Sequence, residues 1–293
     1  MLSDTSRPPQ PGPPYSNGMI PIIVPPLPRA NPHARNLPWH TAFGWLQSGW
    51  MDFWTKPIAS FLYGFGVFAV SILVVWALFL FRYEYALFPA LAGFVVIGPL
   101  IANGLYEKSR RIETGEPIGI ATMVFIRPRS GYQALFMGVM MLGLFLLWLR
   151  SAVLIYALFF GIVPFPGTSE LLPMLFLTPT GWALLATGSV IGALFAGFAF
   201  AISVFAVPML LEEKTDALSA MGISMTMVWN NLPVMLVWGA IVVALFVFSI
   251  ATGFFGLVIA FPVLGHASWH AYSCMRPSDR QIGESERMFI PPV

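Results

Sequence analysis

Long apolar runs constrain this chain more than any other feature of its sequence. They cover residues 58–81, 86–106, 132–161, 182–211, 233–251 and 253–274. A helix needs about 20 apolar residues to cross the hydrocarbon core of a bilayer, and each run has that length. The chain is 57% hydrophobic and only 10% charged, which is far from the composition of a soluble domain. We therefore expect an all-α membrane protein with six transmembrane helices.

A proline pattern recurs in the second, fourth and sixth runs. Pro99, Pro208 and Pro262 are each followed, four and eight positions later, by polar or ionisable residues. These residues are Asn103 and Glu107, Glu212 and Asp216, and His266 and His270. On a helix such offsets lie on one face. The pattern predicts three repeated helix pairs, with the polar residues of the three even-numbered helices near one end of the membrane domain.

Amphipathic segments precede the predicted pairs. Residues 39–56 place Trp39, Phe43, Leu46, Trp50 and Phe53 at helical spacing, with Gln47, Ser48 and Asp52 between them. Residues 217–231 repeat this pattern before Pro233, and residues 118–130 are a weaker copy. Helices with an apolar, tryptophan-rich face and a polar face are typical of the headgroup plane. We expect an interfacial helix before each pair.

The ends of the chain differ in composition from the apolar domain. Eleven of residues 1–38 are prolines, which prevents a helix there. We expect residues 1–38 to be a disordered proline-rich tail, with a docking peptide for a proline-reading partner as the alternative. The membrane domain would cover residues 39–275, and residues 276–293 would form a C-terminal tail.

The distribution of positive charge predicts the orientation. With six spans, 13 of the 15 lysines and arginines fall on the side of the N-terminus. The positive-inside rule then puts both termini in the cytoplasm. The net charge of +2 is too small to indicate nucleic-acid binding.

The polar residues that follow the prolines are candidates for a metal site. Carboxylates and imidazoles suit zinc or iron, and histidines four residues apart offer two ligands from one helix. The candidate ligands are His266, His270, Glu212, Asp216 and Glu107. The histidine pair lacks the glutamate of the hydrolase motif HExxH. The alternatives are side chains that end helices and extend into water, or a substrate or proton site.

Arg150 is the one charge well inside a predicted span. Near the bilayer centre an arginine costs about 2.5–3.5 kcal/mol on insertion scales. We expect it to face the bundle and to pair with a carbonyl oxygen or an acid. Glu84 and Glu170 are the acids expected at that end of the domain.

Four stretches resemble an uncharacterised bacterial integral-membrane family, domain of unknown function 2189. They are GWMDFWTKPIASFLYG (49–64), LWLRSAVLIYALFFG (147–161), FAVPMLLEEKTDALSA (205–220) and GFFGLVIAFPVLGHASWHAY (253–272). The resemblance implies a bacterial inner-membrane protein without an established activity. Some members carry the label cytochrome c oxidase subunit, which implies a respiratory complex as a partner. The sequence argues against a catalytic oxidase subunit, because the two haems and copper of that fold need several more intramembrane histidines and twice as many spans. Here only His266 and His270 lie in a span.

These observations favour a non-catalytic binding, accessory or assembly component in contact with the lipid bilayer. The sequence contains no catalytic motif, and Cys274 is the only cysteine, which excludes an intramolecular disulfide. One alternative is a small-solute transporter, in which repeats form a site near the midplane. The other is a metal- or haem-binding accessory subunit of a respiratory oxidase.

Overall fold

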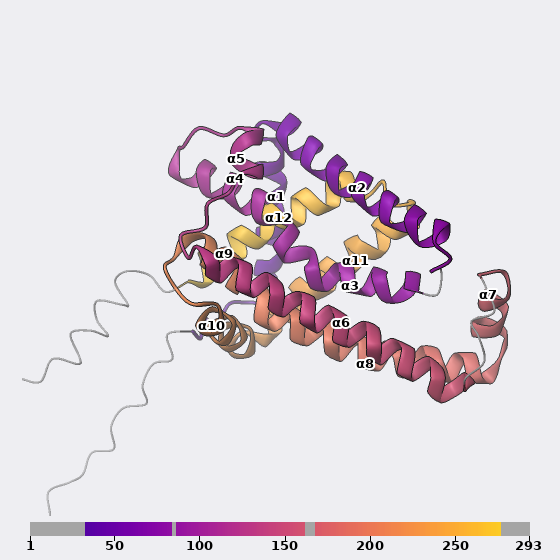
Figure 1. Cartoon of the computed structure of the whole chain (residues 1–293). Helices are drawn as coiled ribbons and strands as arrows, with labels where there is room; N and C mark the ends of the chain where they lie inside the picture. Colours follow the sequence, from indigo (N-terminus) through magenta and orange to yellow (C-terminus); the bar gives the residue numbers. More distant parts are fainter. Residues whose placement is uncertain (1–32, 84–85, 162–167, 277–293) are drawn as a thin grey trace, which may run out of the picture. The chain divides into compact units, whose positions relative to one another are not determined.

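The computed structural model describes residues 33–83, 86–161 and 168–276, and their regular structure is entirely helical (Figure 1). The all-α prediction is therefore confirmed. The helices are α1 (Thr41–Trp54), α2 (Pro57–Leu80), α3 (Leu87–Ile101), α4 (Asn103–Thr114), α5 (Ile120–Val124), α6 (Tyr132–Phe160), α7 (Thr168–Leu177), α8 (Pro179–Ser203), α9 (Ala206–Glu212), α10 (Ala217–Asn230), α11 (Leu232–Ala251) and α12 (Leu257–Met275).

Five helical segments in the described ranges are long and apolar enough to cross a membrane. They are Pro57–Leu80, Leu87–Thr114, Tyr132–Phe160, Pro179–Glu212 and Leu232–Ala251. They correspond to the first five predicted spans. The sixth, α12, is not among them and begins at Leu257, four residues later than predicted. A turn precedes it, in which Gly253 has a φ of +64°.

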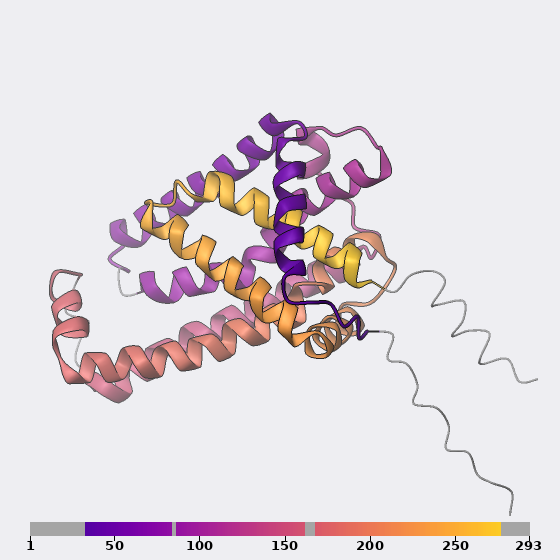
Figure 2. The ribbon, with the colours of Figure 1, turned by 180° about the vertical axis from the view of Figure 1, so that it is seen from behind.

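Helix α12 is enclosed by other helices. It packs against α1, α2, α4 and α11, and Figure 2 shows it behind α1 and beside α11. Most of its side chains are buried in the protein, including His266, Trp269 and Tyr272. A helix surrounded by protein can carry polar residues that a lipid-facing helix would expose to hydrocarbon at high cost. This enclosed environment explains why α12 contains more polar residues than the five apolar segments.

The helix pairing differs from the predicted repeat. Helices α6 and α8 pack together, and so do α11 and α12. Helix α2 instead packs mainly on α12, while α3 packs on α6 and α8. The first predicted pair therefore does not pack as a hairpin, and three equivalent repeats are not confirmed.

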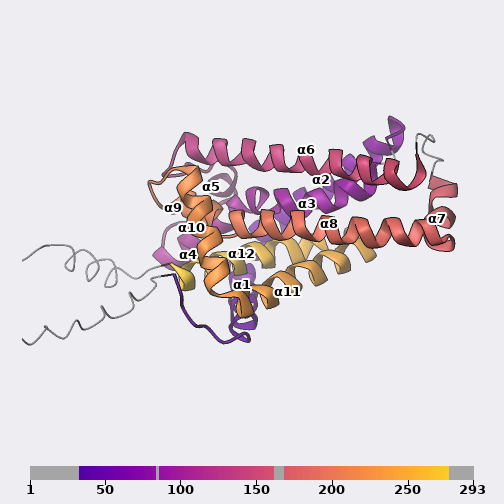
Figure 3. The same ribbon diagram turned by 90° about the horizontal axis from the view of Figure 1, so that it is seen from below.

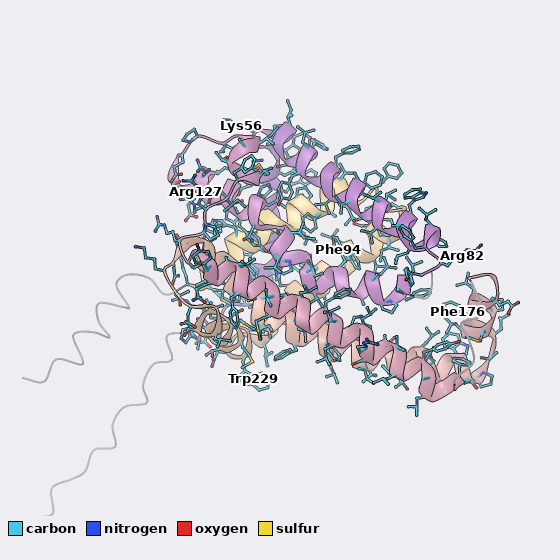
Figure 4. The ribbon with its side chains drawn as sticks, in the orientation of Figure 1. Lys56, Arg82, Phe94, Arg127, Phe176 and Trp229 are labelled. Atoms are coloured by element: carbon cyan, nitrogen blue, oxygen red, sulfur yellow. The ribbon has the colours of Figure 1, made fainter. Side chains whose placement is uncertain are left out.

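Helices α1 and α10 lie across one end of the long helices. Figure 3 shows both at the end where α4 and α9 lie, whereas α7 lies at the opposite end. Figure 4 shows Lys56 and Arg127 toward the α4 end and Arg82 toward the α7 end. Trp39, Phe43 and Trp50, on the predicted apolar face of the first segment, are exposed on the protein, whereas Phe53 of the same predicted face is fully buried. The opposite face of α1 is buried against α12.

Two of the three proline-containing segments are interrupted. The chain changes from α3 to α4 at Ala102, after Pro99, and from α8 to α9 at Val204 and Phe205, before Pro208. Proline removes a helical hydrogen bond, and neighbouring side chains satisfy backbone groups at both breaks. The Tyr63 hydroxyl donates to the Ile101 carbonyl oxygen. Ser224 Oγ donates to Ala201 O at 2.8 Å and accepts from Phe205 N at 3.2 Å.

Two regions outside the predicted helices contain ordered segments. Helix α7 lies between the third and fourth apolar runs, and residues 162–167 are outside the described part. Residues 33–38, assigned to the tail, are held by hydrogen bonds. Arg35 N donates to Asn231 Oδ1 at 2.9 Å, and Asn231 Nδ2 donates to His33 O at 2.7 Å. The predicted tail residues 1–32 and 277–293 lie outside the described residues.

Candidate functional site

A group of buried polar side chains joins four helices at the α4 end of the protein. Asp52 is 6% exposed, and Lys108 and His266 are fully buried. We call the group the polar cluster, and its members are Asp52 of α1, Ser60 of α2, Lys108 and Ser109 of α4, and His266 and His270 of α12. Buried charges are costly unless they are paired or hydrogen-bonded, so each contact in this cluster matters for stability.

Lys108 has three acceptors for the three N–H bonds of its ammonium group. Its Nζ lies 2.6 Å from Ser60 Oγ, 3.0 Å from Asp52 O and 3.5 Å from Lys56 O. Ser60 belongs to α2, Asp52 to α1, and Lys56 is one of the two residues between these helices. The side chain of one residue on α4 therefore fixes the turn between the first two helices.

The hydrogen bonds around His266 determine its protonation. Its Nε2 lies 3.1 Å from Ser60 Oγ, and its Nδ1 lies 2.8 Å from Ser109 Oγ. Ser109 donates its single hydroxyl proton to Asp52 Oδ2 at 2.6 Å, so it must accept from His266 Nδ1–H. Ser60 accepts from Lys108 and keeps its own proton to donate to Nε2. These contacts match a neutral imidazole with its proton on Nδ1.

The cluster is a closed ring. Hydrogen bonds lead from the Lys108 ammonium through Ser60, His266 and Ser109 to the Asp52 carboxylate. Lys108 also donates to the backbone oxygen of Asp52, which closes the ring on the same residue. A polar network with its donors and acceptors matched rigidifies the helices that it joins.

Asp52 also contacts His270 at the less buried side of the cluster. His270 Nε2 lies 2.9 Å from Asp52 Oδ2, and the His270 side chain is 30% exposed. Burial raises the pKa of the Asp52 carboxyl, but the hydrogen bonds from His270 and Ser109 and the nearby imidazoles outweigh burial. The pKa therefore lies below its ordinary value, and the carboxylate is charged at neutral pH.

The other predicted ligands have separate partners. Glu107 accepts from Arg110, at 2.9 Å, and from Arg111, while Glu212 pairs with Arg276. Asp216 Oδ1 accepts from Ser219 N at 2.9 Å and caps α10. In the described part of the chain, no three His, Cys, Asp or Glu side chains are grouped to hold a metal ion. A metal on His266 and His270 stays a prediction of the sequence pattern.

The two remaining predicted polar residues lie outside the cluster. Asn103 is partly buried and begins α4. Arg150 is exposed on α6, which differs from the predicted position facing the bundle. Its long side chain can carry the guanidinium away from the apolar helix. Glu84, one of the two acids expected near it, lies outside the described residues.

The sequence interpretation missed four of the six cluster residues. Asp52 appeared as part of the polar face of an interfacial helix. Lys108 was only one of the 13 lysines and arginines counted on the side of the N-terminus. The available signal was the local pattern around them: Lys108 and Ser109 directly follow Glu107, just past the end of the apolar run 86–106. The cluster forms because α1 crosses α12 next to these residues. A local sequence pattern cannot show which helices cross.

Residues 87–212 match a family model described as a predicted integral membrane protein, DUF2189. This match confirms the family resemblance. The matched DUF2189 segment extends from α3 to α9 and contributes Lys108 and Ser109 to the cluster. Asp52, Ser60 and the two histidines come from helices outside it. Neither the curated proteins nor the solved structures contain a match to the chain.

Proposed function

We propose that this DUF2189-containing chain is a non-catalytic component of the bacterial inner membrane that acts by binding, in an accessory or assembly role. The observation that supports this proposal is the closed hydrogen-bond ring of the polar cluster. The buried charges of the ring bond to groups on neighbouring helices, so the cluster connects α1, α2, α4 and α12. A transport or catalytic site needs polar groups that are available to a substrate.

Proton flux into proteoliposomes tests this proposal against a transporter. Because the ring closes on Asp52, it provides no continuous path between the two membrane surfaces. With a potassium-valinomycin potential and an internal pH dye, we expect the proton leak to equal that of empty liposomes. A potential-driven flux that disappears in the His266→Gln variant would instead favour the transporter.

We also propose that α12 is the sixth span and that both termini lie in the cytoplasm. The cations near the α4 end, including Lys56 and Arg127, support this orientation through the positive-inside rule. Together with the five apolar segments, a sixth crossing would return the chain to the side where it began.

The single cysteine offers a direct measurement of this orientation. Cys274 is exposed near the end of α12. A membrane-impermeant maleimide is expected to label Cys274 in inverted inner-membrane vesicles and to leave it unlabelled in spheroplasts. The Cys274→Ser variant is the control for background. Labelling in spheroplasts alone would contradict the cytoplasmic placement of the C-terminus.

A further inference from the structure

A charged side chain, separate from the polar cluster, lies on the outer face of α6. Arg150 is exposed on this helix, which is long and apolar enough to cross a membrane. Helix α6 packs on α3 and α8, and Figure 3 shows both of them on one side of it. At 3.6 residues per turn, the buried residues of α6 lie on the side opposite Arg150. These buried residues are Met137, Met141, Trp148 and Ile155. Arg150 therefore faces away from the neighbouring helices.

The position of Arg150 along α6 is close to the middle of the span. Helix α6 runs from Tyr132 to Phe160 and its central residue is Leu146, so Arg150 lies about 6 Å from the centre along the axis. The hydrocarbon core extends about 15 Å on each side of the midplane. Residues one or two turns away on the same face are exposed and apolar: Gly143, Leu146, Leu147, Val153, Leu154 and Ala157. Arg150 is thus a charge on an otherwise apolar, lipid-facing surface.

The described part of the chain does not compensate this charge. No described residue forms a hydrogen bond or an ion pair with Arg150. The described acids lie in or beside α1, α4, α9 and α10, at the α4 end, apart from Glu170 of α7 at the opposite end. An unpaired arginine is costly at this depth, and charges inside membranes usually pair with one another. The missing complement is therefore an anionic group from outside the described chain.

A second copy of the chain does not supply this group. In a symmetric dimer through the outer face of α6, the two Arg150 side chains would meet, because both copies use the same surface. Like charges repel strongly in apolar surroundings. A lipid phosphate is fixed in the headgroup layer, whereas a side chain of a neighbouring helix can lie at the depth of Arg150. These considerations favour a helix of a different protein.

The surface beside Arg150 has room for such a helix. Gly143 and Ala157 lie two turns before and two turns after Arg150 on the same face. A Cβ atom added at Gly143 would meet no atom within 4 Å. Small residues at these positions let the backbone of a second membrane helix approach closely.

We propose that the outer face of α6 binds a transmembrane helix of a partner protein, and that an aspartate or glutamate of this helix accepts the hydrogen bonds of the Arg150 guanidinium. The planar guanidinium donates two parallel hydrogen bonds to a carboxylate, which fixes the depth and rotation of the partner helix. This inference rests on the proposed accessory role and names the chemistry of the partner.

Two synthetic leucine-alanine transmembrane peptides form a matched pair of probes. One carries a single glutamate one turn from its centre, and the other carries glutamine at that position. A donor dye on the exposed Cys274 and an acceptor dye on the peptide report binding through energy transfer in phosphatidylcholine vesicles at pH 8. We expect saturable transfer, with about tenfold tighter binding of the glutamate peptide, as a hydrogen bond between charged groups implies.

Four variants make the measurement specific. Arg150→Leu should abolish the preference for glutamate, and Arg150→Lys should keep part of it, because lysine retains the charge without the planar fork. Gly143→Leu should weaken binding of both peptides at least about fivefold. Gly138→Leu is the matched control and should leave binding unchanged. A Cβ atom at Gly138 also meets no atom within 4 Å, but it points about 120° away from Arg150 around the same helix.

Equal affinity of the unsubstituted protein for the two peptides would overturn the proposal. A preference for glutamate that survives in the Arg150→Leu variant would do the same. So would loss of the preference when phosphatidylglycerol replaces a third of the lipid, since a lipid phosphate would then be the partner of Arg150. These outcomes leave the proton-flux result unaffected, so failure of the partner assignment is distinguishable from failure of the proposed function.

Discussion

Replacing Gly49 by leucine is expected to destabilise the protein by about 3 kcal/mol or more, because the new side chain has no room where α1 crosses α12. A Cβ atom at Gly49 would lie 2.6 Å from both Ala267 N and Val263 O. These neighbours are backbone atoms, so the strain is relieved only by moving the two helices apart. Thermal unfolding in detergent micelles, followed by circular dichroism, measures the effect.

The separation of α1 from α12 should also break the polar cluster. Asp52 lies one turn after Gly49 on α1, and its bonds to Ser109 and His270 depend on this close approach. Gly44→Leu is the matched control, since it lies on the same helix and a Cβ atom there would meet no atom within 4 Å. Equal melting temperatures for the two variants would contradict the assignment of Gly49 as the crossing point.

The second large effect is expected for Lys108→Met, with a loss of about 3–5 kcal/mol. Methionine has a similar length but no charge, so the Asp52 carboxylate would stay buried without its neighbouring cation. Ser60 Oγ and the backbone oxygen of Asp52 would also lose their donor. Unfolding in detergent at neutral pH, where Asp52 is charged, measures this loss.

A double-variant comparison separates lost charge balance from lost packing. Asp52→Asn with Lys108→Met removes both charges, and we expect it to be more stable than the sum of the single losses predicts. Lys214→Met is the control for lysine removal, since Lys214 is exposed. Strictly additive losses for Asp52 and Lys108 would show that the two residues act independently and would contradict the closed ring.

The sequence by itself determined the class of the protein and most of its helices. Apolar runs predicted five helices that the structure contains, because the length and hydropathy of a membrane helix are local properties. The amphipathic patterns predicted α1 and α10 for the same reason, since helical periodicity is visible in a short window. Two of the three prolines lie beside the breaks in their spans, because each removes a backbone hydrogen bond.

Only the tertiary structure decided which polar residues meet. The sequence grouped His266 and His270 with Glu212 and Glu107 by their shared spacing from prolines, but those two acids pair with arginines. The histidines meet Asp52 and two serines instead. Spacing within a helix defines a face, whereas the partner of that face depends on how helices cross. Here the absence of a side chain at Gly49 lets α1 approach α12, and that contact brings Asp52 to His266 and Lys108.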